Sequence, residues 1–327
     1  MTAEKLTLVE AVAEGIHDEM KRDESVVLLG EDVGRSGGVF RATEGVYDAF
    51  GPERVIDTPL SETGIAGAAV GLAASGIRPI AEIQFMGFSY AALEQLFTRA
   101  ARMNARSRGQ FPCRMVLRAP FGGGVRAPDL HGESMEAIFV HQPGFKVVVP
   151  STPRDAKGLL TAAIRDPDPV MVFEPKKIYR AFREDVPEES YETPIGEAAI
   201  RREGEDVSIF TWGAVTRPTL EAAEAVAEDG IDPEVVDLRT LSPMDRETIV
   251  ESFKKTGRAV VVHEAPKTGG LAGEITTLLQ EEALFYQEAP IERVTGWDAV
   301  YPLYDLEDFQ LPNATRVEEA IRSAVEE

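Results

Sequence analysis

Short apolar runs alternate with amphipathic helical patterns along most of this 327-residue chain. At its start Leu8, Val12, Ile16 and Met20 recur every four residues, as on one face of a helix. Runs such as SVVLLGED, CRMVLRAP and PVMVFEP are apolar at consecutive positions, which is typical of strands buried on both faces. The alternation predicts an α/β fold with mostly parallel, doubly wound sheets that helices cover on both faces.

The alternation is interrupted once, between residues 176 and 194. This stretch combines prolines with many charges and keeps no sustained period, which indicates a connection between domains. A chain of 327 residues suffices for about two domains of ~150 residues each. We therefore expect two α/β domains, at residues 1–175 and 195–327, joined by a linker at 176–194.

Acidic residues dominate the charge. The 56 Asp and Glu outnumber 34 basic residues, of which only 9 are lysines, and the net charge is −22. Such a field opposes nucleic-acid binding but would attract a basic protein. A lysine-poor acidic surface also suits a halophilic protein in a salt-rich cytoplasm, because salt screens self-repulsion. An ordinary acidic protein is the alternative.

No apolar run reaches the ~18–20 residues of a membrane helix, and the start of the chain lacks the apolar core of a signal peptide. We therefore expect a cytoplasmic protein without a membrane contact. The single cysteine, Cys113, excludes an internal disulfide and a cysteine-based metal cluster. The four histidines include no pair at i, i+4, so a zinc site is not expected. No Walker sequence occurs, and no G-x-G-x-x-G follows a strand.

Two polar residues stand out from this background. Glu62, in DTPLSETGIAG, begins a helix of glycines and alanines; Ser61 can cap that helix, and a carboxylate in its first turn favours the helix dipole. A structural role alone would explain this glutamate. His131, in RAPDLHGES, lies in a polar loop where Asp129 or Glu133 could orient the ring. Surface histidines of this kind are more often inert than catalytic.

The chain contains, in this order, the stretches LLGEDVG, GGVFRATEGVYDAFGPERVIDTPLSETGIAGAAVGLAASGIRPIAEIQF, LRAPFGGGV, HQPGFKVVVPSTPRDAKGLL, VVDLRTLSP and HEAPKTGGLAGEI. Together they resemble the beta subunits of the thiamine-diphosphate-dependent 2-oxoacid dehydrogenases, which include the pyruvate, branched-chain and acetoin enzymes. The resemblance runs from about residue 4 to the end with matching gaps. It implies a transketolase-like pyrimidine-binding domain followed by a transketolase C-terminal domain.

The resemblance also implies residue roles. Glu62 would drive the coenzyme's aminopyrimidine towards the imino form that deprotonates the thiazolium carbon, and a largely dry pocket would raise the pKa of its carboxyl group. Leu60 would touch the pyrimidine, Phe88 would stack on it, and Gln84 would lie nearby. For Phe88, a plain core aromatic is the alternative. His131 would serve the reaction with the lipoyl group.

The resemblance implies two metal sites, one for potassium in this chain and one for magnesium in a partner chain. Some relatives hold a structural potassium ion mainly through backbone carbonyls, and the matching positions here are Cys113, Met115, Val116, Ala163, Asp166 and Asp168. The family's magnesium and diphosphate are held by a GDG followed by an Asn, and this chain contains no GDG. The resemblance therefore implies half of an enzyme, with an alpha subunit that holds magnesium and shares the thiamine diphosphate.

The implied assembly has two alpha and two beta chains and works with a dihydrolipoyl acyltransferase and its lipoyl domain. It would decarboxylate a 2-oxo acid, pyruvate or a branched-chain acid, and pass the acyl group to lipoamide. Two alternatives remain open: an acetoin-cleaving enzyme with the same site, and a non-catalytic subunit whose acidic C-terminal domain only docks partners. The presence of Glu62, Phe88 and His131 together argues against the second.

The charge excess leads to a test of the halophile hypothesis. We expect the melting temperature to rise between ~0.1 and ~2 M potassium chloride, because the Debye length shrinks from ~10 Å to below ~3 Å and self-repulsion is screened. Thermal unfolding followed by circular dichroism measures this, with sorbitol of equal osmolality as the control. A melting temperature that stays flat or falls identifies an ordinary acidic protein.

Overall fold

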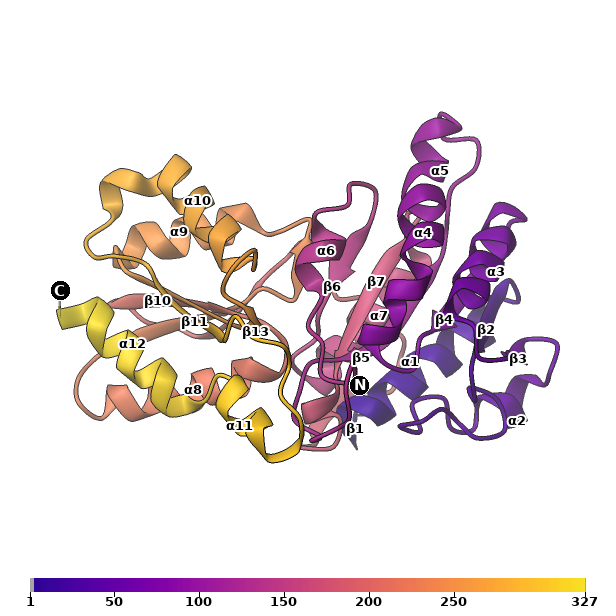
Figure 1. Cartoon of the computed structure of the whole chain (residues 1–327), viewed down its shortest axis with the longest axis horizontal. Coiled ribbons are helices and arrows are strands. Elements are labelled where there is room, and N and C mark those ends of the chain that lie inside the picture. The colour runs from indigo at the N-terminus through magenta and orange to yellow at the C-terminus, as the bar shows by residue number, and fades with distance from the viewer. Residues whose placement is uncertain (1–2, 327) are drawn as a thin grey trace.

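The chain builds two large sheets, one mainly from each half of the sequence (Figure 1). The computed structural model describes residues 3–326. Both sheets are mostly parallel and carry helices on both faces, so the predicted α/β fold is confirmed. Within residues 3–326, no helix is both long and apolar enough to span a membrane.

The first sheet has seven strands in the order β12-β6-β7-β5-β4-β2-β3. All neighbours pair in parallel except β12, which is antiparallel to β6. The strand bounds are β2 (Val26–Gly30), β3 (Val55–Asp57), β4 (Arg78–Glu82), β5 (Val116–Phe121), β6 (Lys146–Val148), β7 (Val170–Pro175) and β12 (Thr240–Ser242). Because β12 comes from the second half of the chain, the two halves share backbone hydrogen bonds.

Helices on the two faces of this sheet enclose two separate cores. One core lies under α1 (Leu8–Arg22) and α7 (Pro153–Arg165), and it includes all four apolar residues of the period noted at the start of the chain. The other lies under α3 (Glu62–Ala74) and the helical segment that follows β4. Successive strand residues such as Leu28 and Leu29 face opposite cores, as alternation along a strand requires. The shorter helices are α2 (Val46–Phe50) and α6 (Glu136–Val140).

The helix expected over FSYAALEQLFTRAARMNA is not continuous. It consists of a 3₁₀ segment (Met86–Ala92), α4 (Leu93–Gln95), a π segment (Leu96–Ala100) and α5 (Ala101–Arg106). Side chains compete for its carbonyls: the Thr98 hydroxyl donates to the carbonyl of Glu94 at 2.7 Å, and Arg102 Nε donates to the carbonyl of Phe97 at 3.0 Å. Such bonds take acceptors away from the regular helix ladder.

The second sheet has five strands in the order β14-β13-β10-β11-β9. Helices α9 and α10 lie over one face, and α8 and α12 over the other (Figure 1). The bounds are β9 (Ala199–Arg202), β10 (Val207–Thr211), α8 (Thr216–Ala227), β11 (Pro233–Asp237), α9 (Arg246–Thr256), β13 (Ala259–Pro266), α10 (Ala272–Ala283), β14 (Glu292–Gly296), α11 (Glu307–Gln310) and α12 (Ala314–Glu326). The antiparallel strand β9 was not expected from the sequence.

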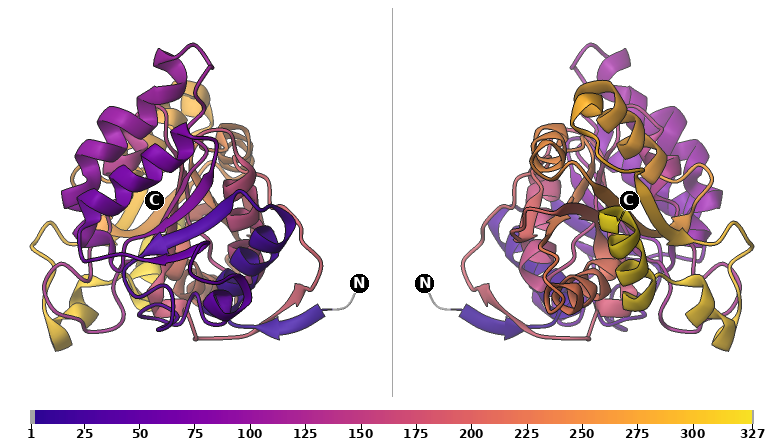
Figure 2. Two further views of the ribbon diagram at one scale, coloured as in Figure 1. Left: turned by 90° about the vertical axis from the view of Figure 1, so that its right-hand side faces the viewer. Right: turned by 90° about the vertical axis from the view of Figure 1, so that its left-hand side faces the viewer.

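The stretch between the sheets contains one strand that its composition does not predict. Strand β8 (Glu184–Pro187) pairs antiparallel with β1 (Ala3–Leu6), and Figure 2 shows this two-stranded ribbon at the edge of the molecule. Paired backbone groups thus tie the stretch to the start of the chain. The domain boundaries at 175 and 195 stay a prediction.

A buried charged cluster links three neighbouring strands at the centre of the first sheet. Arg118 on β5 donates to Glu174 on β7 from Nε and Nη2, at 2.6 and 2.7 Å, and from Nη1 to Glu82 on β4. The Tyr179 hydroxyl donates to the same Glu174 at 2.5 Å. The Arg118 and Glu174 side chains are fully buried. Burial opposes the charge on Arg118, but the two carboxylates outweigh it and raise the pKa of the guanidinium.

We expect Arg118→Met to lower the free energy of unfolding by about 3–5 kcal/mol, because two buried carboxylates would lose their cation. The matched control is Arg217→Met, which removes an exposed i, i+4 pair with Glu221 and should cost less than about 1 kcal/mol. Urea unfolding measures both values. The loss in Arg118→Met should shrink as the pH falls, because protonation neutralises the unpaired carboxylates. Equal losses in the two variants would contradict the role given to Arg118.

Candidate functional site

The residues predicted for the site gather beyond the carboxyl ends of the first sheet's parallel strands. Leu60 and Glu62 follow β3, Gln84 and Phe88 follow β4, and His131 lies in the loop between β5 and α6. In open α/β sheets, ligands bind outside the carboxyl ends of the strands. The topology therefore brings the five residues to one edge of one sheet.

Glu62 begins α3, and its neighbour caps that helix as expected: the Gly64 amide donates to Ser61 Oγ at 3.3 Å. Glu62 is half-buried, whereas Leu60 is 71% exposed. The largely dry pocket expected around Glu62 is therefore not complete in this chain. A second surface over Leu60 would be needed to exclude water from the carboxylate.

Further carboxylates lie close to Glu62, at the end of β2. Burial, and after it the negative charges of Asp32 and Glu62, raise the pKa of the Glu31 carboxyl group. Gln84 Nε2 donates to the carbonyl of Glu31 and to Asp32 Oδ2, both at 3.4 Å. The structure thus joins Gln84 and Glu62 through the end of β2. The resulting surface is rich in hydrogen-bond acceptors, which suits a ligand that donates N–H groups.

Phe88 and His131 are in contact, as their proposed shared site requires. The His131 ring lies 5.0 Å from the Phe88 ring, edge to face, and 4.2 Å from the Phe85 ring. Both predicted residues are half-buried. Phe85 was not identified from the sequence, although its spacing of three from Phe88 was a usable signal.

The orientation of His131 comes from the backbone. Its Nδ1 lies 2.8 Å from the carbonyl oxygen of Asp129. A carbonyl only accepts, so Nδ1 carries a proton, and in the neutral ring Nε2 has the free lone pair. The Asp129 carboxylate instead accepts from the Leu130 amide at 3.1 Å. The ring is therefore oriented by the main-chain carbonyl of Asp129, and not by an Asp129 or Glu133 carboxylate as expected.

The loop that carries His131 is pressed against the segment that carries Phe88. A Cβ at Gly87 would lie 2.0 Å from the carbonyl oxygen of Leu130, so only glycine permits this approach. Leu130 and Arg126 have positive φ values of 65° and 50°. Non-glycine residues persist in this region only where their surroundings fix them, and such residues cluster at functional sites.

The cluster around Arg118 lies directly beneath this edge and was missed in the sequence. Glu82 is the last residue of β4, two positions before Gln84. Glu174 likewise lies near the carboxyl end of β7, and Arg118 lies between the two glutamates in the middle of β5. The available signal was a charged residue within each of three strand-like runs, Glu82, Arg118 and Glu174, which indicates partners across neighbouring strands.

The six positions matched to a potassium site lie around the end of α7 and the start of β5. Lys146 Nζ is 2.7 Å from Asp166, and Asn104 donates to Asp168 at 2.8 Å. The carbonyls of Cys113, Met115 and Ala163 each accept a backbone amide. Val116 begins β5, and burial, followed by the charge of Asp168, raises the pKa of the Cys113 thiol to about 12. Among residues 3–326, no group of three or more His, Cys, Asp or Glu side chains is arranged for a metal ion.

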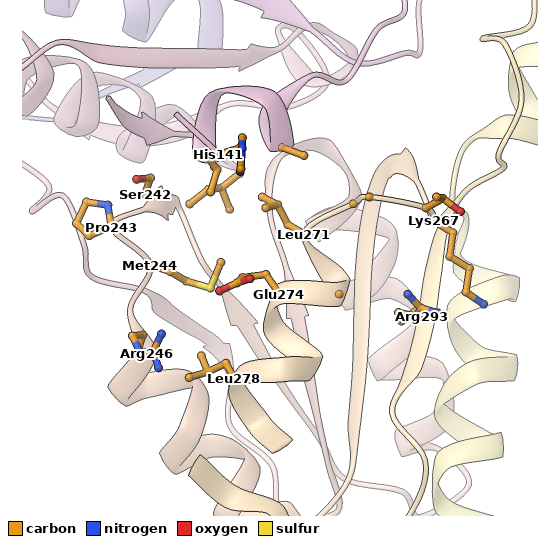
Figure 3. Close-up of a pocket in the computed structure, with 17 residues that line it drawn as sticks. His141, Ser242, Pro243, Met244, Arg246, Lys267, Leu271, Glu274, Leu278 and Arg293 are labelled. Atoms are coloured by element: carbon orange, nitrogen blue, oxygen red, sulfur yellow. The ribbon is translucent and has the colours of Figure 1, made fainter. Parts of the chain in front are cut away.

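A cavity of about 760 Å³ lies elsewhere, between α6 and the loop that leads into α10 (Figure 3). Its charged lining comes from Arg246, Lys267, Glu274 and Arg293, with His141 above (Figure 3). None of the five residues at the sheet edge lines it. The candidate site is thus an open edge of one chain and not this cavity.

Two family models match the chain. Residues 4–181 match "Transketolase, pyrimidine binding domain", and residues 196–317 match "Transketolase, C-terminal domain". The "Pyruvate dehydrogenase E1 component subunit beta" of Bacillus subtilis is 49% identical over 98% of this chain and 99% of its own length. The protein of the same name from Acholeplasma laidlawii is 50% identical over 97% of each. Among solved structures, a "Split gene transketolase, inactive beta4 tetramer" superposes with a TM-score of 0.79 at 25% identity, covering 99% of both chains.

Proposed function

The chain belongs to the family of pyruvate dehydrogenase E1 beta subunits, with their transketolase-type domains, and from this membership we propose that it forms half of a pyruvate-decarboxylating enzyme. With an alpha subunit it would decarboxylate pyruvate on thiamine diphosphate and pass the acyl group to lipoamide. The observation that carries the proposal is the gathering of Glu62, Phe88 and His131 at one sheet edge. In this proposal the first domain, residues 1–175, holds the pyrimidine.

The residues at the sheet edge fit the pyrimidine half of the coenzyme. Glu62 offers a half-buried acceptor, Leu60 offers an exposed apolar surface, and Phe88 offers a ring face. When bound, thiamine diphosphate supplies an electron sink for decarboxylation. The part of Glu62 is to exchange a proton with a ring nitrogen, and a partner chain over Leu60 would exclude water from that exchange.

His131 would act in the second step, the transfer of the acyl group to the lipoyl group. Its protonated Nδ1 is fixed on the Asp129 carbonyl, which leaves Nε2 to take or give a proton at a lipoyl sulfur. The half-buried ring lies in a loop after the end of β5, and loops at such an edge can meet a mobile substrate arm. The two steps therefore rest on different residues of this chain.

Two features of this chain support an alpha subunit as its partner. The chain contains no GDG for the diphosphate and magnesium, and Leu60 beside Glu62 is 71% exposed. We propose a complex of two alpha and two beta chains, in which alpha holds magnesium and covers Leu60.

Two further components belong to the same proposal. A dihydrolipoyl acyltransferase would dock on the acidic surface, and a structural potassium ion would be held by carbonyls of residues 113–116 and 163–168. Assaying the co-expressed pair with pyruvate, branched-chain 2-oxo acids and acetoin decides between the three enzymes.

We expect Glu62→Gln to lower pyruvate decarboxylation by the assembled enzyme by ~10²–10⁴-fold, because glutamine keeps the shape but cannot exchange the proton. Exchange of the thiazolium proton, followed by quenched-flow NMR, should slow in parallel. Glu53→Gln, which removes an exposed carboxylate from the turn before β3, is the control for charge. If exchange is unchanged in Glu62→Gln, this residue is only a carboxylate at the start of a helix.

His131→Ala should separate the two steps. We expect acylation of the lipoyl domain to fall by ~10²-fold or more, while decarboxylation measured with an artificial electron acceptor falls much less. The control is His141→Ala, an exposed histidine at the end of α6. Equal losses in both assays would place His131 in an earlier step, and no loss in either would remove it from the mechanism.

A further inference from the structure

A loop from the second half of the chain reaches the loop that carries His131. Residues 297–310, here called the C-terminal loop, connect β14 to α12 and include α11. The base of this loop is closed: Trp297 Nε1 donates to the carbonyl of Phe309 at 2.7 Å, and Gln310 Nε2 donates to the carbonyl of Trp297 at 3.1 Å. A loop of this length whose ends are held together is a compact Ω-loop.

Tyr301 is the aromatic side chain of this loop that contacts the β5–α6 loop. A Cβ added to Gly123 would lie 1.9 Å from the Tyr301 hydroxyl, and one added to Gly132 would lie 2.1 Å from its ring. The half-buried ring of Tyr301 therefore fits between two glycines of the β5–α6 loop, and Gly132 directly follows His131. By contrast, Val300 beside it is 86% exposed. The glycines at 123 and 132 make room for this one ring.

Two buried glutamates from the second half hold the backbone of the same loop. The Gly123 amide donates to Glu264 Oε2 at 3.0 Å, and the Arg126 amide donates to Glu307 Oε1 at 3.1 Å. The second oxygen of Glu307 accepts from the Tyr301 hydroxyl at 2.9 Å. Burial, and after it the charge of Glu307, raises the pKa of Tyr301, so its hydroxyl stays a donor.

Lys176 balances this negative charge from the end of β7. Its side chain is 3% exposed, and its Nζ has no hydrogen-bond partner within the described chain. Burial lowers its pKa to about 8, against the attraction of Glu264, Glu307 and Glu133. A buried charged cluster therefore fills the junction between the two halves. Since its carboxylates bind the loop backbone, a shift of the C-terminal loop would be transmitted to the β5–α6 loop.

We infer that Tyr301 is a positioning residue for His131, so that the second half of the chain sets the geometry of acyl transfer. The inference rests on the role proposed for His131. The left-handed backbone at Arg126 and Leu130 needs surroundings that fix it, and Tyr301 contributes to them through its contact with Gly132 and its hydrogen bond to Glu307, which holds the Arg126 amide. Without the ring, the His131 segment would move away from Phe85 and Phe88.

The experiment compares Tyr301→Ala, Tyr301→Phe and Phe309→Ala in the assembled enzyme. Tyr301→Ala should lower acylation of the lipoyl domain by roughly 10–100-fold, since displacement by ~1 Å can cost 10²-fold. Decarboxylation measured with an artificial acceptor should change by less than about twofold, because Tyr301 positions His131 and not Glu62. Tyr301→Phe keeps the ring and should restore most of the acylation rate. Phe309→Ala removes an aromatic side chain that is 73% exposed on the same loop and should match the parent.

A second readout does not depend on activity. Arg126 is an exposed trypsin site in the middle of the β5–α6 loop. Cleavage after Arg126 should be faster in Tyr301→Ala than in the parent, Tyr301→Phe and Phe309→Ala proteins. Unchanged cleavage in Tyr301→Ala overturns the inference.

The activity results separate this inference from the proposed function. If Tyr301→Ala lowers both rates equally while His131→Ala separates them, Tyr301 only supports the fold and the inference is wrong, whereas the proposed function stands. If His131→Ala does not separate the rates, the proposed role of His131 fails and the inference fails with it.

Discussion

The guanidinium of Arg118, held between Glu82 and Glu174, fixes three central strands of the first sheet relative to one another. Desolvation makes such a cluster a poor source of net stability, but breaking it is costly because a buried charge is left alone. The cluster matters because it fixes where these strands end. The three strands lead directly into the segment of Phe88, the loop of His131 and Lys176, so a slip of one strand would displace a part of the site.

The site is divided between what one chain fixes and what it leaves open. Backbone contacts fix the edge-to-face pair of Phe88 and His131, through the approach of Leu130 to Gly87 and the carbonyl of Asp129. The surface around Leu60 and Glu62 is left half open. This division agrees with the proposal that the chain places His131 by itself, whereas its coenzyme pocket is completed only upon assembly.

Local patterns predicted the elements well. The period through Leu8, Val12 and Ile16 does form α1, and Ser61 does cap α3, because each depends on neighbours in the sequence. Contacts between distant segments were not predictable. A glycine at 87 gives no indication that the Leu130 carbonyl lies against it, and Asp129 orients His131 through an atom that every residue has. The helical segment after β4 is divided into 3₁₀, α and π parts although its apolar period looked continuous. The roles expected for Glu62, Phe88 and His131 were implied by the family resemblance, whereas their contacts became visible only in the structure.

Strand β12 leaves the second half of the chain to pair with β6 at the edge of the first sheet. An edge strand without a partner presents unpaired N–H and C=O groups, to which other chains can add. The first half alone would expose β6 in this way, although it contains every residue of the candidate site. The two halves are therefore interdependent in folding, and loss of the second should turn the first into a self-associating species.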